Sequence, residues 1–430
     1  MLKLPPDHPQ RRVLADEAHA RPFETVPTPA RVTYVAVLID GESRAAEHAQ
    51  VARLCGLHGA TPPAPGDTHF IASLGAVRLK WERHGEFSGY MVIAPGVGDE
   101  PFAEPAGLAL PPGWWEALPG HTVVAVHAEL RKAPPEGLPQ VRELARHFGG
   151  HMMAGSAVAE GAAHAFTDFR LHDDGCARIL VFDRNLNPRQ AGRLLQRLFE
   201  IEAYRMLALL ALPMAREQLP RIVAIERSLS QTTDGIARDS GRDEDLLHGL
   251  TRLAAEVENG IASSHFRFGA CRAYSELVDT RIAELREQRL PGLQTLQEFM
   301  ARRFKPAVAT CLTVSQRLRE LSDRIAQANT LLATRVGIVR ERQNQQLLAS
   351  MDRRARLQLR LQRTVEGLSV AAIVYYVVGV VGLVAKGMKS GGVPLNPDLV
   401  AGLAVPVCVG AVMLALRRAR KSLADSSHDD

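Results

Sequence analysis

The segment that decides the architecture of this chain spans residues 367–385 and has the sequence GLSVAAIVYYVVGVVGLVA. A second apolar segment, LVAGLAVPVCVGAVMLAL, follows at residues 399–416. They contain 19 and 18 residues without a charge. As helices they would extend about 27 to 29 Å, close to the ~30 Å hydrocarbon core of a bilayer. Buried helices of a soluble core are the alternative, and we predict a transmembrane hairpin over residues 366–417.

Basic residues on the flanks of the two segments predict their orientation. The connecting loop, 386–398, contains only Lys386 and Lys389, and residues 418–430 form a basic and then acidic tail. The positive-inside rule therefore places both chain ends in the cytoplasm of a bacterial inner (cytoplasmic) membrane, with the lipid bilayer as a partner. The start of the chain lacks the apolar region of a signal peptide. The membrane-flanking basic residues, which could also meet anionic headgroups, are Arg353, Arg354, Arg356, Arg360, Arg363, Arg417, Arg418, Arg420 and Lys421.

The composition excludes several classes of protein. With 430 residues, 46% of them hydrophobic and 23% charged, the chain can form two or three domains with real cores. The net charge of +5 comes from the membrane end, since residues 1–352 carry 41 basic and 42 acidic residues. A nucleic-acid partner is therefore not expected. The five cysteines form no CxxC pair, so neither a disulfide framework nor a structural zinc site is predicted.

Residues 1–187 have the pattern of an α+β cytosolic domain. Helices are predicted over 42–56 and 136–148, and turns at 84–86 and 173–175 predict antiparallel pairing. The apolar runs that we expect to form strands are 31–39, 69–74, 76–83, 87–94, 121–130, two runs within 156–171, and 177–183.

Residues 188–365 are predicted to form long helices, which build a bundle and a stalk. Asn187 and Pro188 are a good helix start, and the helical stretches are 188–237, 242–290 and 293–365. Because no proline occurs between Pro306 and Pro394, one helix could continue from 307 through the first apolar segment. Its apolar stripe at 3–4 spacing has to be buried in a bundle or in an oligomer, and we expect a homo-oligomer.

Three stretches of the sequence together resemble a bacterial family of uncharacterised membrane-anchored proteins. They are HPQRRVLADEAHARPFE (8–24), LKWERHGEFSGY (79–90) and the C-terminal hairpin. The resemblance covers essentially the whole chain. It implies membrane attachment but no activity, because the family is a domain of unknown function.

The order of domains also resembles the CorA-type divalent-cation channels. In that family a stalk helix enters the membrane as the pore helix of a pentamer and ends in a Gly-Met-Asn motif. Gly387 and Met388 match that motif, but Lys389 replaces its asparagine. The resemblance implies an oligomeric cation channel with these three residues at its entrance and with Ser369 and Tyr376 as pore candidates. A divalent cation is then the cargo, although ammonium groups at an entrance repel cations. No cofactor is assigned.

Motifs of known enzymes are missing, and we predict no catalytic activity. Asp16 to His19 spell the DEAH sequence of helicases, yet the Walker A loop that this chemistry needs is absent. The HExxH and GxSxG motifs are absent as well. Within the HARP sequence at 19–22, His19 and Arg21 either close a helix or bind an anion or a partner.

A second cluster of polar side chains follows Trp81. On an extended strand, Glu82, His84 and Glu86 would share one face and could ligate a metal. A turn at 84–86 would remove that shared face and favour ordinary cross-strand charge pairs. His151, followed by Met152 and Met153, could suggest a soft-metal site, but we interpret this group as core at the start of a strand.

Two hypotheses about function follow. One is an oligomeric CorA-like cation channel or transporter. The other is a membrane-anchored scaffold or sensor whose cytosolic domain binds a partner or a small ligand and transports nothing. A continuous helix from stalk to pore is expected for the first, and replaceable membrane anchors are expected for the second.

Overall fold

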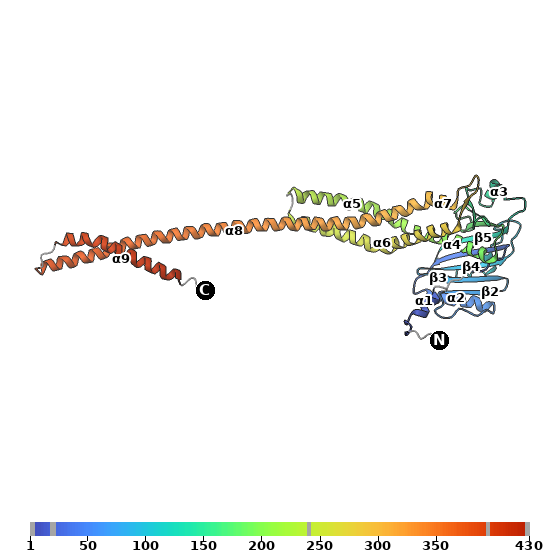
Figure 1. Cartoon of the computed structure of the whole chain (residues 1–430), viewed down its shortest axis with the longest axis horizontal. Helices are drawn as coiled ribbons and strands as arrows, with labels where there is room; N and C mark the ends of the chain where they lie inside the picture. The colour runs from blue at the N-terminus through green and yellow to red at the C-terminus, as the bar shows by residue number, and fades with distance from the viewer. Residues whose placement is uncertain (1–4, 18–22, 239–241, 393–395, 426–430) are drawn as a thin grey trace. The chain divides into compact units, whose positions relative to one another are not determined.

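The computed structural model describes residues 5–17, 23–238, 242–392 and 396–425. The chain divides into two compact units, Met1–Asn329 and Thr330–Asp430. The first unit contains a β-sheet with helices on both of its faces, and the described residues of the second are almost all helical (Figure 1).

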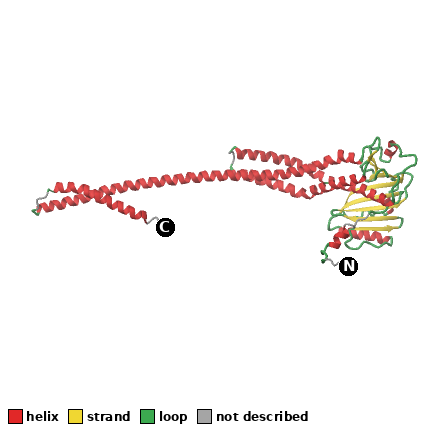
Figure 2. Ribbon diagram, viewed as in Figure 1, coloured by secondary structure: helices red, strands yellow, loops and turns green. Residues whose placement is uncertain are grey.

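A mixed sheet of nine strands forms the centre of the first unit, where Figure 2 draws it in yellow. The strand order is β2-β3-β4-β1-β5-β8-β7-β6-β9. Strands β5 and β8 pair in parallel, and the other neighbours pair antiparallel. The strands are β1 (Ala30–Leu38), β2 (His69–Leu74), β3 (Val77–Arg83), β4 (Phe87–Pro95), β5 (His121–Lys132), β6 (Ala154–Val158), β7 (Ala163–Thr167), β8 (Ala177–Asp183) and β9 (Gln288–Arg289).

The strands predicted from apolar runs are present, and the antiparallel pairing is confirmed. One boundary matters for function, because the second run within 156–171 was expected to continue to residue 171, whereas β7 ends at Thr167. The next residue but one, Phe169, has a φ of 55°. This is the left-handed region, which a regular strand cannot contain, so residues 168–176 form a loop.

Alternation along β1 (Ala30–Leu38) assigns its side chains to two separate cores. Val35 and Val37 belong to a core that includes Val51 and Leu54 of α2 (Arg44–Leu57). On the other face, Tyr34 stacks on Phe199 of α4 (Pro188–Leu209) with ring centroids 5.0 Å apart. The sheet is therefore covered on both faces, by α2 together with the short helix η1 (Ala106–Ala109) and by α4.

Long helices follow the sheet in sequence, as predicted. They are α4 (Pro188–Leu209), α5 (Ala211–Ala237) and α6 (Asp243–Leu285). The expected single helix 188–237 is broken at Leu210, because Pro213 has no N–H for the hydrogen bond to Leu209 that would continue α4 into α5. Shorter helices are α1 (Arg11–Glu17), α3 (Val141–Arg146), α7 (Leu296–Phe299) and the π-helical turn η2 (Met300–Phe304).

The last two helices carry the apolar segments. Helix α8 (Lys305–Ser390) is unbroken over 86 residues, and α9 (Pro397–Asp425) follows it. Leu318, Leu321 and Ile325 of α8 are buried, which agrees with the predicted apolar stripe. By length and composition, the helix Leu296–Ser390 and the helical stretch Pro397–Ala415 can each cross a membrane, and 6% and 0% of their most apolar windows are buried.

Candidate metal centre

Three side chains from two loops of the first unit meet at one point. Asp168 and His172 lie on the loop that follows β7, and His151 lies between α3 and β6. Gly149 and Gly150, with φ of 64° and 75°, turn the chain after α3 and bring His151 toward Asp168. The backbone N–H of His172 donates to the carbonyl of Cys176 (3.0 Å), which closes the second loop on itself.

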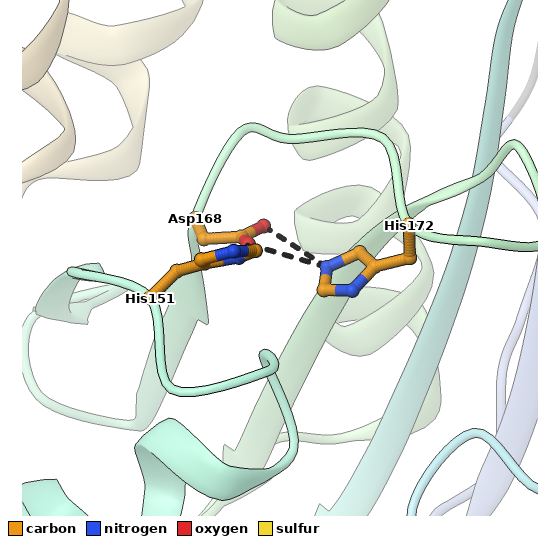
Figure 3. Close-up of side chains that lie close together, drawn as sticks. All are labelled: His151, Asp168 and His172. Atoms are coloured by element: carbon orange, nitrogen blue, oxygen red, sulfur yellow. Dashed lines mark hydrogen bonds and ion pairs between the residues drawn. The ribbon is translucent and has the colours of Figure 1, made fainter.

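The carboxylate of Asp168 lies between the two imidazoles (Figure 3). Its Oδ2 is 3.0 Å from Nδ1 of His151 and 3.2 Å from Nε2 of His172. The side chain of Asp168 is fully buried and that of His172 is 7% exposed, whereas 38% of the His151 side chain is open to solvent. The Asp168 carboxylate is thus a buried acceptor, and the cluster is open to solvent at His151.

These distances suit a transition-metal ion. The ligand atoms of the three residues all lie within 4.8 Å of one another. Ligands bonded at ~2.0–2.1 Å to a tetrahedral Zn²⁺ are about 3.3 Å apart, close to the two distances measured to Asp168. Two imidazoles and one carboxylate leave a coordination position open, as in sites that keep a bound water. The cluster could therefore hold Zn²⁺ or a similar ion with small shifts of the two rings.

Sequence reasoning missed this group. His151 was interpreted as part of a core with its two methionines, but only Met153 is buried, and Met152 is 77% exposed. Asp168 was assigned to a strand expected to end at residue 171, which would have carried His172 away from it along the chain direction. The polar residues Asp168 and His172, four positions apart in a stretch without glycine or proline, were the one hint of a ligand site. No spacing motif connects them to His151.

Glu82, His84 and Glu86, the metal ligands considered from sequence, engage separate partners. Strand β3 ends at Arg83 and β4 begins at Phe87, so the turn at 84–86 is present. Glu82 is ion-paired with Lys80 (2.9 Å), and the ring of His84 stacks on Phe87. Glu86 pairs with Arg267 of α6. The structure therefore brings these three carboxylate and imidazole groups to different contacts.

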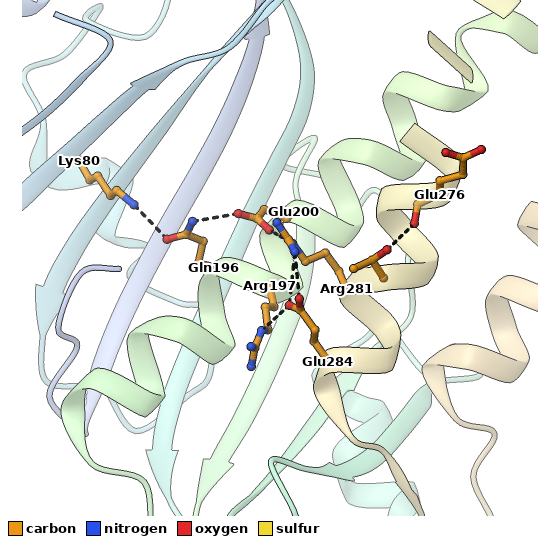
Figure 4. A network of polar contacts seen from close by, with 8 residues as sticks. Lys80, Gln196, Arg197, Glu200, Glu276, Arg281 and Glu284 are labelled. Carbon is orange, nitrogen blue, oxygen red and sulfur yellow. Dashed lines mark hydrogen bonds and ion pairs between the residues drawn. The ribbon is translucent and has the colours of Figure 1, made fainter. Parts of the chain in front are cut away.

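A polar network connects this part of the sheet to the helices (Figure 4). Lys80 of β3 is 1% exposed and donates to Gln196 of α4 (3.0 Å). Gln196 donates to Glu200 (2.9 Å), which is ion-paired with Arg281 of α6. Arg281 also contacts Glu284 (3.2 Å). The network connects β3 to α4 and α4 to α6. Its charges are paired, as a structural role requires.

The remaining predicted residues are distributed along the two C-terminal helices. Gly387, Met388 and Lys389 form the last turn of α8, and the carbonyls of Gly387 and Met388 both accept the N–H of Gly391 (3.1 Å each). Tyr375 and Tyr376 are 78% and 73% exposed. His19 and Arg21 lie outside the described residues, as do the side chains of Arg420 and Lys421. Exposed positions on the helices are taken by Ser369, Arg353, Arg354, Arg356, Arg360, Arg363, Arg417 and Arg418.

Comparison with known protein families gives one match. Residues 6–423 fit the model of DUF3422, described as a protein of unknown function. Comparison with curated proteins and with solved structures gives no significant match, so the resemblance to CorA-type channels finds no support there. Because the family model covers nearly the whole chain, this chain belongs to the DUF3422 family of proteins of unknown function.

Proposed function

We propose that this chain is a membrane-anchored sensor that binds a divalent transition-metal ion in its α+β unit. The observation that carries the proposal is the meeting of His151, Asp168 and His172, with a buried carboxylate between two imidazoles. Among the two hypotheses from sequence, this is the anchored sensor whose cytosolic unit binds a small ligand.

The donor set selects the class of ion. Imidazole nitrogen suits Zn²⁺, Cu²⁺, Fe²⁺ and Ni²⁺, whereas Mg²⁺ and Ca²⁺ prefer oxygen ligands throughout. The fully buried Asp168 supplies the one negative charge that partly offsets a divalent ion. The half-exposed His151 gives the ion a path from solvent. Binding would fix two separate loops to one ion, and the resulting restraint on both loops is what a sensor can report.

Metal content of the full chain tests the proposal. The chain in lipid nanodiscs is stripped with a chelator, dialysed against Zn²⁺ or Co²⁺, and analysed by mass spectrometry for bound metal. We expect one bound ion per chain and a tetrahedral or five-coordinate visible spectrum for Co²⁺. Asp168→Asn and His172→Gln should lower affinity beyond the ~10–100-fold that loss of an outer-shell partner costs.

His58→Gln is the matched control, since His58 is an exposed histidine at the end of α2 and should bind metal as the wild type does. Circular dichroism establishes that each variant is folded. Wild-type protein without bound metal, or equal metal content in wild type and in a folded Asp168→Asn variant, would refute the proposal.

The membrane topology is part of the same proposal. Support comes from two helical stretches that are long and apolar enough to cross a bilayer and that bury 6% and 0% of their most apolar windows. Gly382 lies where an added Cβ would be 3.8 Å from Ala401 Cβ, which favours a hairpin of α8 and α9. In the expected topology both ends of the chain lie on the cytoplasmic side of the inner membrane. Reporter fusions at residue 392 and at the C-terminus should therefore report opposite sides.

A homo-oligomer is proposed from the exposed stripe of α8. Leu357, Leu361, Val365 and Leu368 recur at 3–4 spacing and are 61% to 70% exposed in the single chain. Such a stripe is stable in water or lipid when helices of other copies cover it. The native mass of the detergent extract should exceed that of one chain, and Leu357→Glu with Leu361→Glu should reduce it. A wild-type mass equal to one chain would exclude the oligomer.

A cation channel is the second candidate, favoured by one observation. Helix α8 continues without interruption from Lys305 to Ser390, as a helix running from stalk to pore would. Flux of Mg²⁺, Co²⁺ and Zn²⁺ into proteoliposomes tests it, with Lys389→Asn beside the wild type. Cation entry above that of empty vesicles would support a channel, and no flux from either protein would leave the anchored sensor.

A further inference from the structure

A cavity on the α2-side face of the sheet has the properties of a small-molecule site. It has a volume of about 380 Å³ and is lined by β1, β5, the helix η1 and the loop that follows η1. This volume lies within the ~300–1,000 Å³ typical of ligand pockets. Val35 and Val37 of β1 and Ala125 of β5 give it an apolar floor.

One polar pair stands in that apolar wall. Thr33 and His127 lie directly opposite each other on β1 and β5, with Thr33 Oγ1 3.1 Å from His127 Nδ1. The Thr33 oxygen already accepts the N–H of Gly107 (2.8 Å). Among the described contacts Nδ1 of His127 is the acceptor available to the Thr33 hydroxyl proton, and on that basis we assign the imidazole proton to Nε2.

His127 Nε2 is the group that can recognise a ligand. Within the described part of the chain it forms no hydrogen bond, and its nearest acidic atom, Asp174 Oδ2, is 3.9 Å away, beyond hydrogen-bond length. Burial lowers the pKa of His127, so the ring is neutral near pH 7. The pocket therefore offers one N–H donor in an apolar setting.

The walls also restrict the charge and shape of a ligand. Glu116 lines the pocket and repels anions, whereas the charge of Asp174 beside His127 is offset by Arg178 at 3.9 Å. Trp115 lines the pocket while its indole N–H donates to the Gly107 carbonyl (3.1 Å), so its ring adds only apolar surface there.

We infer that this pocket binds a small, uncharged aromatic molecule whose carbonyl oxygen accepts a hydrogen bond from His127 Nε2. The inference goes beyond the proposed metal sensor and does not depend on it, because none of the lining residues used here is a proposed metal ligand.

Binding of 7-methoxycoumarin, an uncharged aromatic lactone, tests the inference. The full chain in nanodiscs is titrated by equilibrium dialysis against empty nanodiscs, and tryptophan emission is followed in parallel. We expect saturable binding at one site with quenching of Trp115. His127→Phe should weaken binding about 3- to 10-fold, since one hydrogen bond is lost. Ala125→Leu, which fills the floor, should abolish it.

Two controls define the class of ligand. Ala49→Leu makes the same change at an exposed position of α2 and should leave binding unchanged. Coumarin-3-carboxylate has a similar shape with a negative charge and should bind at least ~10-fold more weakly. Absence of saturable binding to the wild type, equal binding by folded Ala125→Leu protein, or equal affinity for the anion would each overturn the inference.

Discussion

Glu47 is a buried carboxylate with three side-chain partners in the sheet unit. Its side chain is fully buried and accepts hydrogen bonds from Trp81 Nε1 and from the Tyr90 hydroxyl, each at 2.8 Å. Arg44 balances its charge at 3.2 Å. One carboxylate therefore satisfies two buried donors and a cation that come from three elements.

Replacing Glu47 with alanine should destabilise the fold by about 2–4 kcal/mol, because it leaves the buried donors of Trp81 and Tyr90 without their acceptor, while Arg44 keeps its bonds to Ser88 and to two carbonyls. Urea unfolding followed by tryptophan emission measures the change, since Trp81 is itself in the affected contact. The exposed Glu42→Ala variant should stay within about 0.5 kcal/mol of wild type. Equal stability of the two variants would contradict this account.

His164 on β7 predicts how stability depends on pH. Burial, aided by Arg184, lowers its pKa below the ordinary value of 6.5. The unfolded chain then binds a proton that the folded chain does not, so stability falls as pH drops below about 6.5. The loss is at most ~1.4 kcal/mol per pH unit for one group.

His164→Gln should reduce this fall between pH 7 and pH 5.5, as measured by urea unfolding at each pH, while His127 and His147, whose pKa values burial also lowers, keep their own contributions. His121→Gln, a change at an exposed histidine, should keep the wild-type slope. The depressed pKa values of Asp40 and Asp183 affect stability only at lower pH, below their ordinary value of 3.8, and do not overlap this window.

Two helical glycines give opposite predictions at the scale of elements. Gly192 of α4 supports the segment before β1, since an added Cβ would lie 1.7 Å from the carbonyl oxygen of Glu24. Gly192→Ala should therefore push that segment away and cost about 1–3 kcal/mol. At Gly269 of α6 a Cβ meets nothing within 4 Å, so Gly269→Ala should stabilise the helix by about 0.5–1 kcal/mol.

Thermal unfolding of the two alanine variants beside the wild type decides the matter. A melting temperature that falls for Gly192→Ala and rises for Gly269→Ala agrees with the packing of α4 against the chain at Glu24. Equal shifts in one direction would mean that helix propensity alone governs both positions.

Elements were predicted well from sequence where local pattern determines them. Strands β2 and β8 have the predicted ends, since turn residues bound each apolar run. The parallel pairing of β5 with β8 was not predicted, because alternation identifies a strand but not its neighbour. The candidate metal centre was missed because sequence patterns likewise do not show which loops meet in space. His151 and Asp168 lie 17 residues apart on two loops, and only the tertiary fold brings them together.

Both helical stretches that are long and apolar enough to cross a membrane have their apolar segments after Arg342, outside the unit Met1–Asn329. A chain ending after Arg342 lacks both apolar segments and retains the compact unit Met1–Asn329. It should therefore appear in the soluble fraction of the cell lysate, with the metal stoichiometry of the full chain. The full chain should stay in the membrane pellet after an alkaline carbonate wash, and so should a control with residues 343–430 intact and Ala49→Leu. A truncated chain found in the pellet would contradict this division.

The loop between β7 and β8 has one more consequence. It carries His172 of the candidate metal centre, and a few residues later it carries Asp174 and Cys176 beside the pocket of Thr33 and His127. A metal ion that restrains this loop alters the work needed to fill the pocket, and thermodynamic reciprocity requires the pocket's occupant to change metal affinity by the same factor. The factor by which bound metal changes the dissociation constant of the pocket's ligand would then equal the factor by which that ligand changes the dissociation constant of the metal.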